Sequence, residues 1–232
     1  MILLCLDTSG PVAGVALVQD GVLRYEAMAV NAFTHSQSIL PMTEEAYRRT
    51  GLSVQETDLF AVTVGPGSFT GVRIGVSTVK ALAHANDRKC VAVDALEAMA
   101  AGVQPFPGLI CPIQDARAGQ VYGAAFSGGT RERLLPDEPL KLEDYLDKAA
   151  SFGKNMLFLG DGMPVHREKI GELLGDRAVF APMHLCSLRP AAAAYLAWEK
   201  RGEAVEHQRL QPLYLRAPQA ERQKNLREMG HE

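Results

Sequence analysis

The chain has 232 residues, 47% of them hydrophobic and 22% charged, which suffices for one large α/β domain or two small lobes with buried cores. Its formal net charge is -3, whereas domains that hold RNA mainly through its phosphates usually carry a basic excess. This balance argues against RNA binding by the surface as a whole, so an RNA contact would need a local patch or a partner protein.

Cysteine usage and hydropathy indicate the compartment. The four cysteines stand far apart in or beside apolar runs, without CxxC spacing, and predict buried free thiols in a reducing environment. The apolar start Met1–Leu6 lacks a basic leader and meets Asp7 at once, and no other apolar run is long enough to span a bilayer. We therefore expect a soluble, cytoplasmic protein without a membrane segment.

The first half of the chain predicts an antiparallel meander followed by alternating helices and strands. Short apolar runs are separated by turn signals at 7–11 and 19–21. Helical spacing of apolar residues follows, with Gly51 as the expected stop of the first helix. The expected strands are 2–6, 12–18, 22–28, 59–64 and 91–93, and the expected helices are 36–49, 71–85 and one beginning at 95.

A break at Pro105, Pro107 and Gly108 marks the expected lobe boundary, after which a similar pattern begins again. Both halves start with a hairpin that carries an Asp at its first turn, a weak repeat of architecture that indicates a duplicated ribonuclease-H-like lobe. The expected strands of the second half are 109–114, 120–126, 156–159 and 178–180, and its expected helices are 142–150, 167–174 and 190–201. We expect an N-terminal lobe at 1–104, a C-terminal lobe at 105–216 and a flexible tail at 217–232.

Gly65–Gly75 is the most distinctive stretch, a glycine-rich loop between an expected strand and an expected helix. Such a loop can present backbone N–H groups to an anion. Its spacing fits neither a Walker A loop nor the dinucleotide fingerprint, so a tight turn with close helix packing is the simpler interpretation. Gly71 and Gly75 share a helix face, where small residues let another backbone approach closely.

Asp7 ends the first expected strand and opens a turn. Its carboxylate can be interpreted as holding a metal–nucleotide complex or as capping the turn by accepting from nearby N–H groups. Asp115 at the matching turn is open to the same two interpretations, with Arg117 placed to offset its charge. The candidate phosphate-loop or cleft residues are Asp7, Thr8, Ser9, Gly10, Gly65, Gly67, Ser68, Thr70, Asp115 and Arg117.

Patterns typical of metal and nucleophile chemistry are missing from the sequence. The six histidines form neither HxxxH nor HExxH spacing, and no GxSxG motif stands out. We therefore predict no metal site and no catalytic residue.

Several motifs resemble the TsaB (YeaZ) family of bacterial tRNA threonylcarbamoyladenosine biosynthesis proteins, and they occur in the expected order over most of the chain. The glycine-rich block is the most specific of them. The matching pieces are Leu6-Asp7-Thr8-Ser9, His35-Ser36 with Leu40-Pro41, Gly65–Gly75, Asp115-Ala116-Arg117 with Gly119 and Val121-Tyr122, and Pro212 with Tyr214-Leu215-Arg216.

The resemblance implies a two-lobed actin-like ATPase (ribonuclease-H-like) α/β fold with mixed sheets. It also implies a non-catalytic partner subunit, required by a homologous catalytic subunit, TsaD, for threonylcarbamoyl transfer to N6 of the adenosine beside the anticodon of tRNA. A small ATPase, TsaE, joins that assembly, and tRNA is contacted mainly through the complex. TsaD holds a metal with an HxxxH pair, which this sequence lacks. No cofactor is expected for this chain, and nucleotide binding stays open.

The family's partner surface corresponds here to the expected helices at 36–49 and 71–85, which we expect to contact TsaD or, without it, a second copy. The alternative is that their apolar strip only faces the sheet of its own lobe. The candidate interface residues are Gly71, Val72, Gly75, Val76, Thr78, Val79, Ile39, Met42 and Ala46.

Three other functions are alternatives to the role of a partner subunit. A nucleotide-dependent, kinase-like enzyme of the same superfamily would need a phosphate site around Asp7 and Gly65–Gly71, but such enzymes usually have Gly where Ser9 stands. A peptidase would need ligands or a nucleophile that the sequence does not offer. An RNA-binding module is disfavoured by the net charge, despite the locally basic end of the chain.

Overall fold

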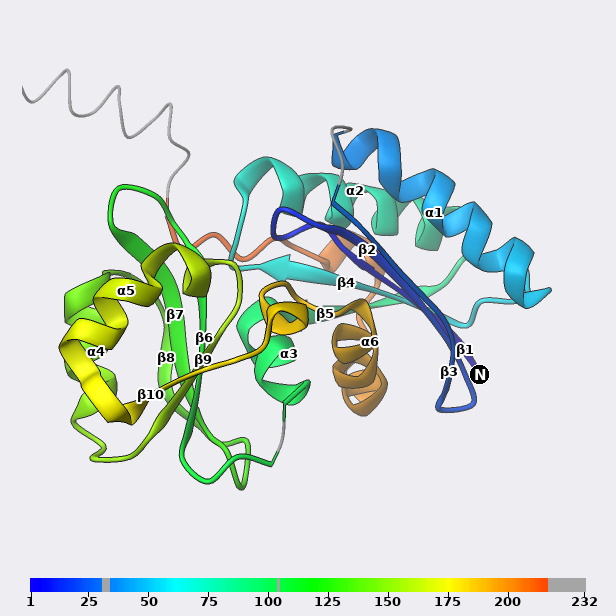
Figure 1. Ribbon diagram of the computed structural model, residues 1–232. Helices are drawn as coiled ribbons and strands as arrows, with labels where there is room; N and C mark the ends of the chain where they lie inside the picture. The colour runs from blue at the N-terminus through cyan, green and yellow to red at the C-terminus, as the bar shows by residue number, and fades with distance from the viewer. Residues whose placement is uncertain (31–33, 104, 217–232) are drawn as a thin grey trace, which may run out of the picture.

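The computed structural model describes residues 1–30, 34–103 and 105–216 (Figure 1). Within these residues the chain forms two five-stranded mixed sheets with helices on their faces. No helix in the described ranges is long and apolar enough to cross a membrane. The expected tail at 217–232 lies outside the described residues.

The N-terminal sheet has the strand order β3-β2-β1-β4-β5. β1 pairs with β2 antiparallel and with β4 parallel, and β2 pairs with β3 antiparallel, so the predicted meander is confirmed. β1 is buried along its whole length because helices cover both faces of the sheet, which explains its unbroken apolar run. The strands are β1 (Ile2–Asp7), β2 (Ala13–Gln19), β3 (Val22–Ala29), β4 (Leu59–Gly65) and β5 (Lys89–Asp94).

The C-terminal sheet repeats this topology with the order β8-β7-β6-β9-β10. β6 pairs with β7 antiparallel and with β9 parallel, as β1 does with β2 and β4. The expected repeat of a ribonuclease-H-like lobe is thus confirmed at the level of topology. The strands are β6 (Leu109–Asp115), β7 (Gln120–Ser127), β8 (Arg133–Lys141), β9 (Met156–Leu159) and β10 (Ala178–Phe180).

The helices and sheets form five layers. α1 (His35–Thr50) and α2 (Phe69–Ala85) cover the outer face of the first sheet, and α4 (Leu142–Ala150) and α5 (Gly162–Leu174) cover the outer face of the second. α3 (Ala95–Ala101) and α6 (Pro190–Glu199) lie between the sheets, where one apolar cluster draws side chains from both (Figure 1).

The end of the described chain returns to the N-terminal lobe, so the predicted range 105–216 does not form one lobe. The Pro190 ring of α6 packs against Gly14 of β2, and Leu210 is 1% exposed in the core beneath α1 and α2. The Leu213 N–H then donates to the Val64 carbonyl at 2.7 Å. The orange-red segment in Figure 1 passes from this lobe toward the other. We call residues 207–216 the C-terminal strap.

The predicted interface strip needs a correction, because its side chains are already used inside the lobe. A Cβ on Gly75 would lie 2.4 Å from Thr8 Oγ1, and one on Gly71 would lie 2.1 Å from the Thr8 carbonyl oxygen. Contact with another chain through these buried residues is therefore contradicted, and only Thr78 and Met42 of the set stay half-buried. The buried members of the set are Gly71, Val72, Gly75, Val76, Val79, Ile39 and Ala46.

Candidate functional site

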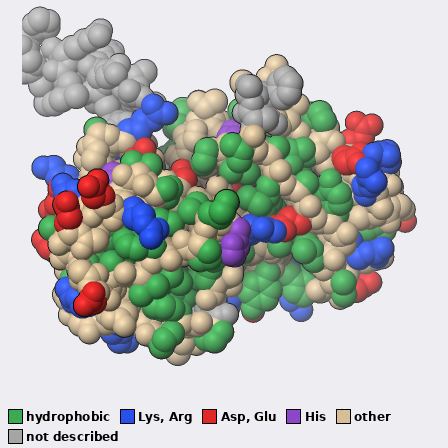
Figure 2. All heavy atoms as spheres, in the orientation of Figure 1, with side chains coloured by type: hydrophobic (Ala, Val, Ile, Leu, Met, Phe, Trp, Pro, Cys, Tyr) green, Lys and Arg blue, Asp and Glu red, His purple; other side chains and the backbone are tan. Residues whose placement is uncertain are grey.

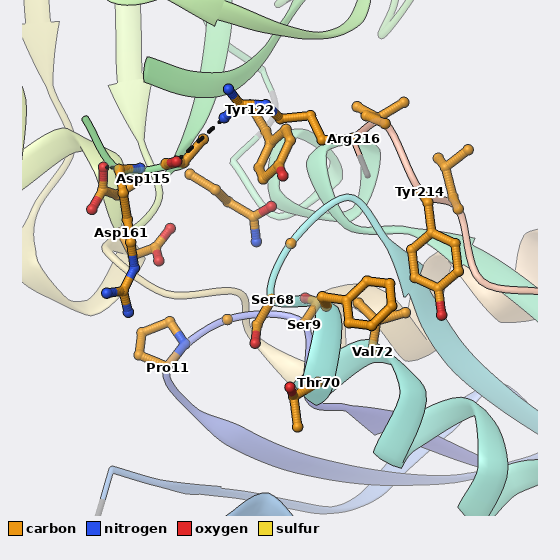
Figure 3. A pocket seen from close by; sticks show the side chains of 18 of the residues that line it. Ser9, Pro11, Ser68, Thr70, Val72, Asp115, Tyr122, Asp161, Tyr214 and Arg216 are labelled. Atoms are coloured by element: carbon orange, nitrogen blue, oxygen red, sulfur yellow. Dashed lines mark hydrogen bonds between the residues drawn. The ribbon is translucent and has the colours of Figure 1, made fainter. Parts of the chain in front are cut away.

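A cavity of about 810 Å³ lies between the two lobes. It is bounded by the β1–β2 turn and the glycine-rich loop on one side, by the ends of β6 and β9 on the other, and by the C-terminal strap (Figure 3). Of the predicted cleft residues it is lined by Ser9, Gly10, Gly67, Ser68, Thr70, Asp115 and Arg117. Asp7, Thr8 and Gly65 lie behind this lining.

Asp7 is 2% exposed, and one oxygen of its carboxylate accepts three hydrogen bonds from the same lobe. Oδ1 accepts from the Ser9 N–H at 3.0 Å, from the Ser9 hydroxyl at 2.7 Å and from the Thr63 hydroxyl. Burial raises the pKa of this carboxyl, while the three donors act against that rise. The arrangement matches the turn-capping interpretation.

The glycine-rich loop is pressed onto the same turn. The Ser68 N–H donates to the Ser9 carbonyl at 2.7 Å, and the Thr8 hydroxyl donates to the Gly71 carbonyl at 2.7 Å. A Cβ on Gly67 would lie 2.2 Å from the Ser9 carbonyl oxygen, so only glycine permits this approach. The loop thereby packs backbone against backbone, as the simpler interpretation of its glycines expects.

Asp115 at the matching turn of the second lobe is less enclosed. Its Oδ1 accepts from the Arg117 N–H at 2.9 Å and lies 3.7 Å from His166 Nε2. Arg117 has a left-handed backbone, with φ at 63°, and among the described residues its guanidinium forms no ion pair. The predicted neutralisation of Asp115 by Arg117 is therefore replaced by a backbone contact.

Two further residues of the cavity wall escaped the sequence analysis, Gln114 at the end of β6 and Asp161 at the start of α5. Gln114 is 2% exposed, although it carries an amide. Burial, together with the negative charges of Asp115 and Asp7, raises the pKa of Asp161 to about 6. The Gly160-Asp161-Gly162 turn after β9 was the available signal, because in a duplicated fold this turn faces the end of β6.

The C-terminal strap closes another side of the cavity. The Tyr214 and Phe69 rings lie 4.8 Å apart between centroids, and Leu213 is held on β4. Arg216 (Figure 3) then reaches the second lobe. There its guanidinium donates to the Ala116 carbonyl at 3.4 Å and to the Gln120 side chain. The strap thus connects the lobes across the mouth of the cavity.

In the described parts of the chain, no three His, Cys, Asp or Glu side chains are grouped as metal ligands. The free thiols of Cys5, Cys90 and Cys111 are buried, and burial raises the pKa of each.

The model of the family described as tRNA N6-adenosine threonylcarbamoyltransferase (TsaD) matches residues 29–231. The chain is 35% identical over 223 residues to the tRNA threonylcarbamoyladenosine biosynthesis protein TsaB of Bacillus subtilis, covering 95% of this chain and 96% of that protein. The chain belongs to the TsaB family.

Two more likenesses agree with this. TsaB of Escherichia coli is 31% identical over 224 residues, which cover 93% of this chain and 95% of that protein. A Pseudomonas aeruginosa crystal structure, described as an uncharacterized protein with similarity to peptidase YeaZ, superimposes with a TM-score of 0.77 at 29% identity and covers 93% of this chain and 99% of its own. The resemblance and the actin-like ATPase fold predicted from the sequence are confirmed.

Proposed function

We propose that this TsaB-family chain acts in tRNA threonylcarbamoyladenosine biosynthesis as a non-catalytic subunit of a complex with the catalytic subunit TsaD and the ATPase TsaE. The observation that carries the proposal is the likeness to B. subtilis TsaB along nearly the full length of both chains. Full-length correspondence favours a shared role over a shared domain alone.

The hydrogen bonds of the cleft residues support the non-catalytic role. The Asp7 carboxylate, which would hold a metal–nucleotide complex in a kinase-like enzyme, instead binds three donors of its own lobe. The sequence also has no HxxxH pair for a catalytic metal. The chain would therefore contribute a surface to the transfer reaction while TsaD contributes the reacting groups.

The outer faces of α1 and α2 are the best surface for TsaD. Their buried faces pack on the sheet, but Leu40 is 52% exposed and Ser77 and Ala81 are exposed one turn apart on α2. Figure 2 shows mostly uncharged side chains over the upper middle of this face and charged side chains at its right end, where α1 ends with the ion pairs of Glu45 with Arg48 and Arg49. Leu40, Ser77 and Ala81 are apolar or small side chains that suit helix-to-helix docking with TsaD or with a second copy, and the exposed Arg73 lies one turn before Ser77 on the same side of α2.

Reconstitution tests the proposed role. tRNA, threonylcarbamoyl-AMP, TsaD and TsaE are combined with and without this chain, and threonylcarbamoyladenosine is measured by mass spectrometry. We expect modification only when the chain is present, and none from the chain alone. Modification that proceeds equally without it would refute the role.

The docking face is tested by Ser77→Arg, which places a long charged side chain on the exposed side of α2. We expect loss of co-elution with TsaD and an unchanged melting curve. Ser151→Arg, at an exposed helix end of the other lobe, serves as the control and should co-elute normally. Normal co-elution of Ser77→Arg would place the interface elsewhere.

A further inference from the structure

Three carboxylates and two cationic groups gather between the two sheets, where side chains of α3 and β8 meet. The Arg133 guanidinium lies 3.4 Å from Asp94 Oδ2 and 3.5 Å from Glu97 Oε2. It also forms an ion pair with Asp137 Oδ1. Lys200 Nζ lies 2.7 Å from Glu97 Oε2. We call these five residues the interlobe cluster, which carries one negative charge in excess when every member is ionised.

The interlobe cluster joins the two lobes. Asp94 ends β5 and caps α3, where its Oδ1 accepts from the Glu97 N–H at 2.7 Å. Arg133 and Asp137 belong to β8, the edge strand of the C-terminal sheet. The guanidinium lies over the Phe126 ring, 4.6 Å from its centroid, which restricts the directions in which it can point. Its ion pairs therefore hold the start of α3 against the second sheet.

The excess charge of the interlobe cluster is poorly solvated. The side chain of Asp137 is 9% exposed and that of Asp94 is 17% exposed. The next cation along the chain, Arg131, is paired with Glu199 and does not supply the missing positive charge. A buried carboxylate without a counterion of its own is costly, whereas a proton held between two carboxyls removes the charge and adds a hydrogen bond.

We propose that Asp94 and Asp137 bind one proton between them, and that this shared proton holds the start of α3 in the N-terminal lobe against β8 of the C-terminal lobe. The protonated carboxyl donates to the other one, so the two side chains attract each other instead of repelling. Arg133 and Lys200 then balance the two negative charges that remain. Burial, together with the hydrogen bond and the charge of Asp94, raises the pKa of Asp137 to about 8, against the opposing effect of Arg133.

The shared proton makes the contact between the lobes sensitive to pH. The ordinary pKa of an Asp side chain is 3.8, so between this value and about 8 the folded chain holds a proton that the unfolded chain lacks. The unfolding equilibrium constant therefore rises with pH over this range, by up to about tenfold per pH unit, and levels off above about pH 8. An alkaline shift thus loosens the joint, whatever the role of the chain in tRNA modification.

Asp137→Asn tests the proton with an amide, which donates to Asp94 at every pH and still accepts from Arg133. The unfolding constants of the original full-length chain and of this variant are measured by urea denaturation between about pH 6 and pH 9. We expect the ratio of the original constant to that of the variant to rise up to about tenfold per pH unit until about pH 8, and then to stay level. A ratio that is independent of pH would overturn the proposal.

Asp94→Asn separates a shared proton from one that Asp137 holds alone. Asparagine still caps α3, and its amide donates permanently to the Asp137 carboxylate, so the pH dependence above about pH 6 should be lost in this variant too. Asp176→Asn, at an exposed position, serves as the control and should keep the dependence of the original chain. If Asp94→Asn also keeps it, the proton is not shared.

A second measurement needs no variant. The carboxyl carbons of Asp94 and Asp137 are followed by ¹³C NMR of the full-length chain between about pH 5 and pH 10. Both resonances should move in a common step near pH 8, because the proton belongs to the pair. An Asp94 resonance that does not move in that step, or complete deprotonation of both carboxyls below about pH 6, would overturn the shared proton.

Discussion

The two hairpin turns of this protein occupy equivalent places in duplicated lobes but have opposite surroundings. At the N-terminal turn the Asp7 carboxylate binds three donors and a glycine-rich loop lies on the turn. At the C-terminal turn the Asp115 side chain receives one backbone N–H, and its neighbours Gln114 and Asp161 keep unpaired atoms. The two lobes thus share a topology but differ at this turn. The N-terminal turn is packed and hydrogen-bonded within its own lobe, whereas the C-terminal turn lines the cavity.

The largest expected difference between the turns comes from deleting their carboxylates. Asp7→Ala leaves two donors of Ser9 and the Thr63 hydroxyl without an acceptor in the interior, and should lower the free energy of unfolding by about 3 kcal/mol or more. Asp115→Ala removes one acceptor at a partly exposed turn and should cost about 1 kcal/mol or less. Urea denaturation of both variants measures this, and equal costs would show that the turns do not differ.

A smaller effect is expected from two helical glycines. A Cβ at Gly75 meets Thr8 Oγ1 at 2.4 Å, so Gly75→Ala should destabilise the protein by about 1–3 kcal/mol despite the better helix propensity of alanine. Gly171→Ala in α5 has nothing within 4 Å and should stabilise it by about 0.5–1 kcal/mol. Thermal melts of the two variants show whether each one is more or less stable than the original protein. A stabilising Gly75→Ala would mean that α2 does not pack tightly against Thr8 of the N-terminal turn.

The smallest expected effect concerns Asp161 and depends on pH. Its folded pKa of about 6 lies above the ordinary value of 3.8, so the folded state binds the proton more tightly and stability falls as pH rises through this range. Asp161→Asn should therefore add about 1–3 kcal/mol of stability at about pH 7 and about a third of that at about pH 4.5. Urea denaturation at both pH values is compared with the exposed control Asp176→Asn, and a gain of equal size at both would contradict the assigned cause.

Much of the fold is predictable because its signals are local. Apolar runs and turn residues give the meander and the outer helices, and Gly51 ends α1 in a left-handed conformation, with φ at 70°, as expected. β8 was missed because Pro136 and Pro139 interrupt it, and proline is tolerated there since β8 lies at the edge of its sheet.

The site was less predictable because its decisive contacts join distant parts of the chain. Gly71 and Gly75 signalled close packing, but only the fold shows that the packing partner is Thr8 of the same lobe. Gln114 and Asp161 carry no motif, and their importance appears only when β6 and β9 are placed side by side. Charge and spacing in the sequence indicate candidate site residues, whereas burial in the fold decides which of them can contact a ligand or a partner.

The C-terminal strap also determines when the N-terminal lobe can finish folding during translation. Leu210 fills the core formed by the first strands, and α6 covers the inner face of the N-terminal sheet. On the ribosome, the segment made first must therefore keep apolar surface uncovered until almost the whole chain has emerged. The N-terminal lobe is begun first and completed last, so nascent chains released early would expose that surface to chaperones and proteases.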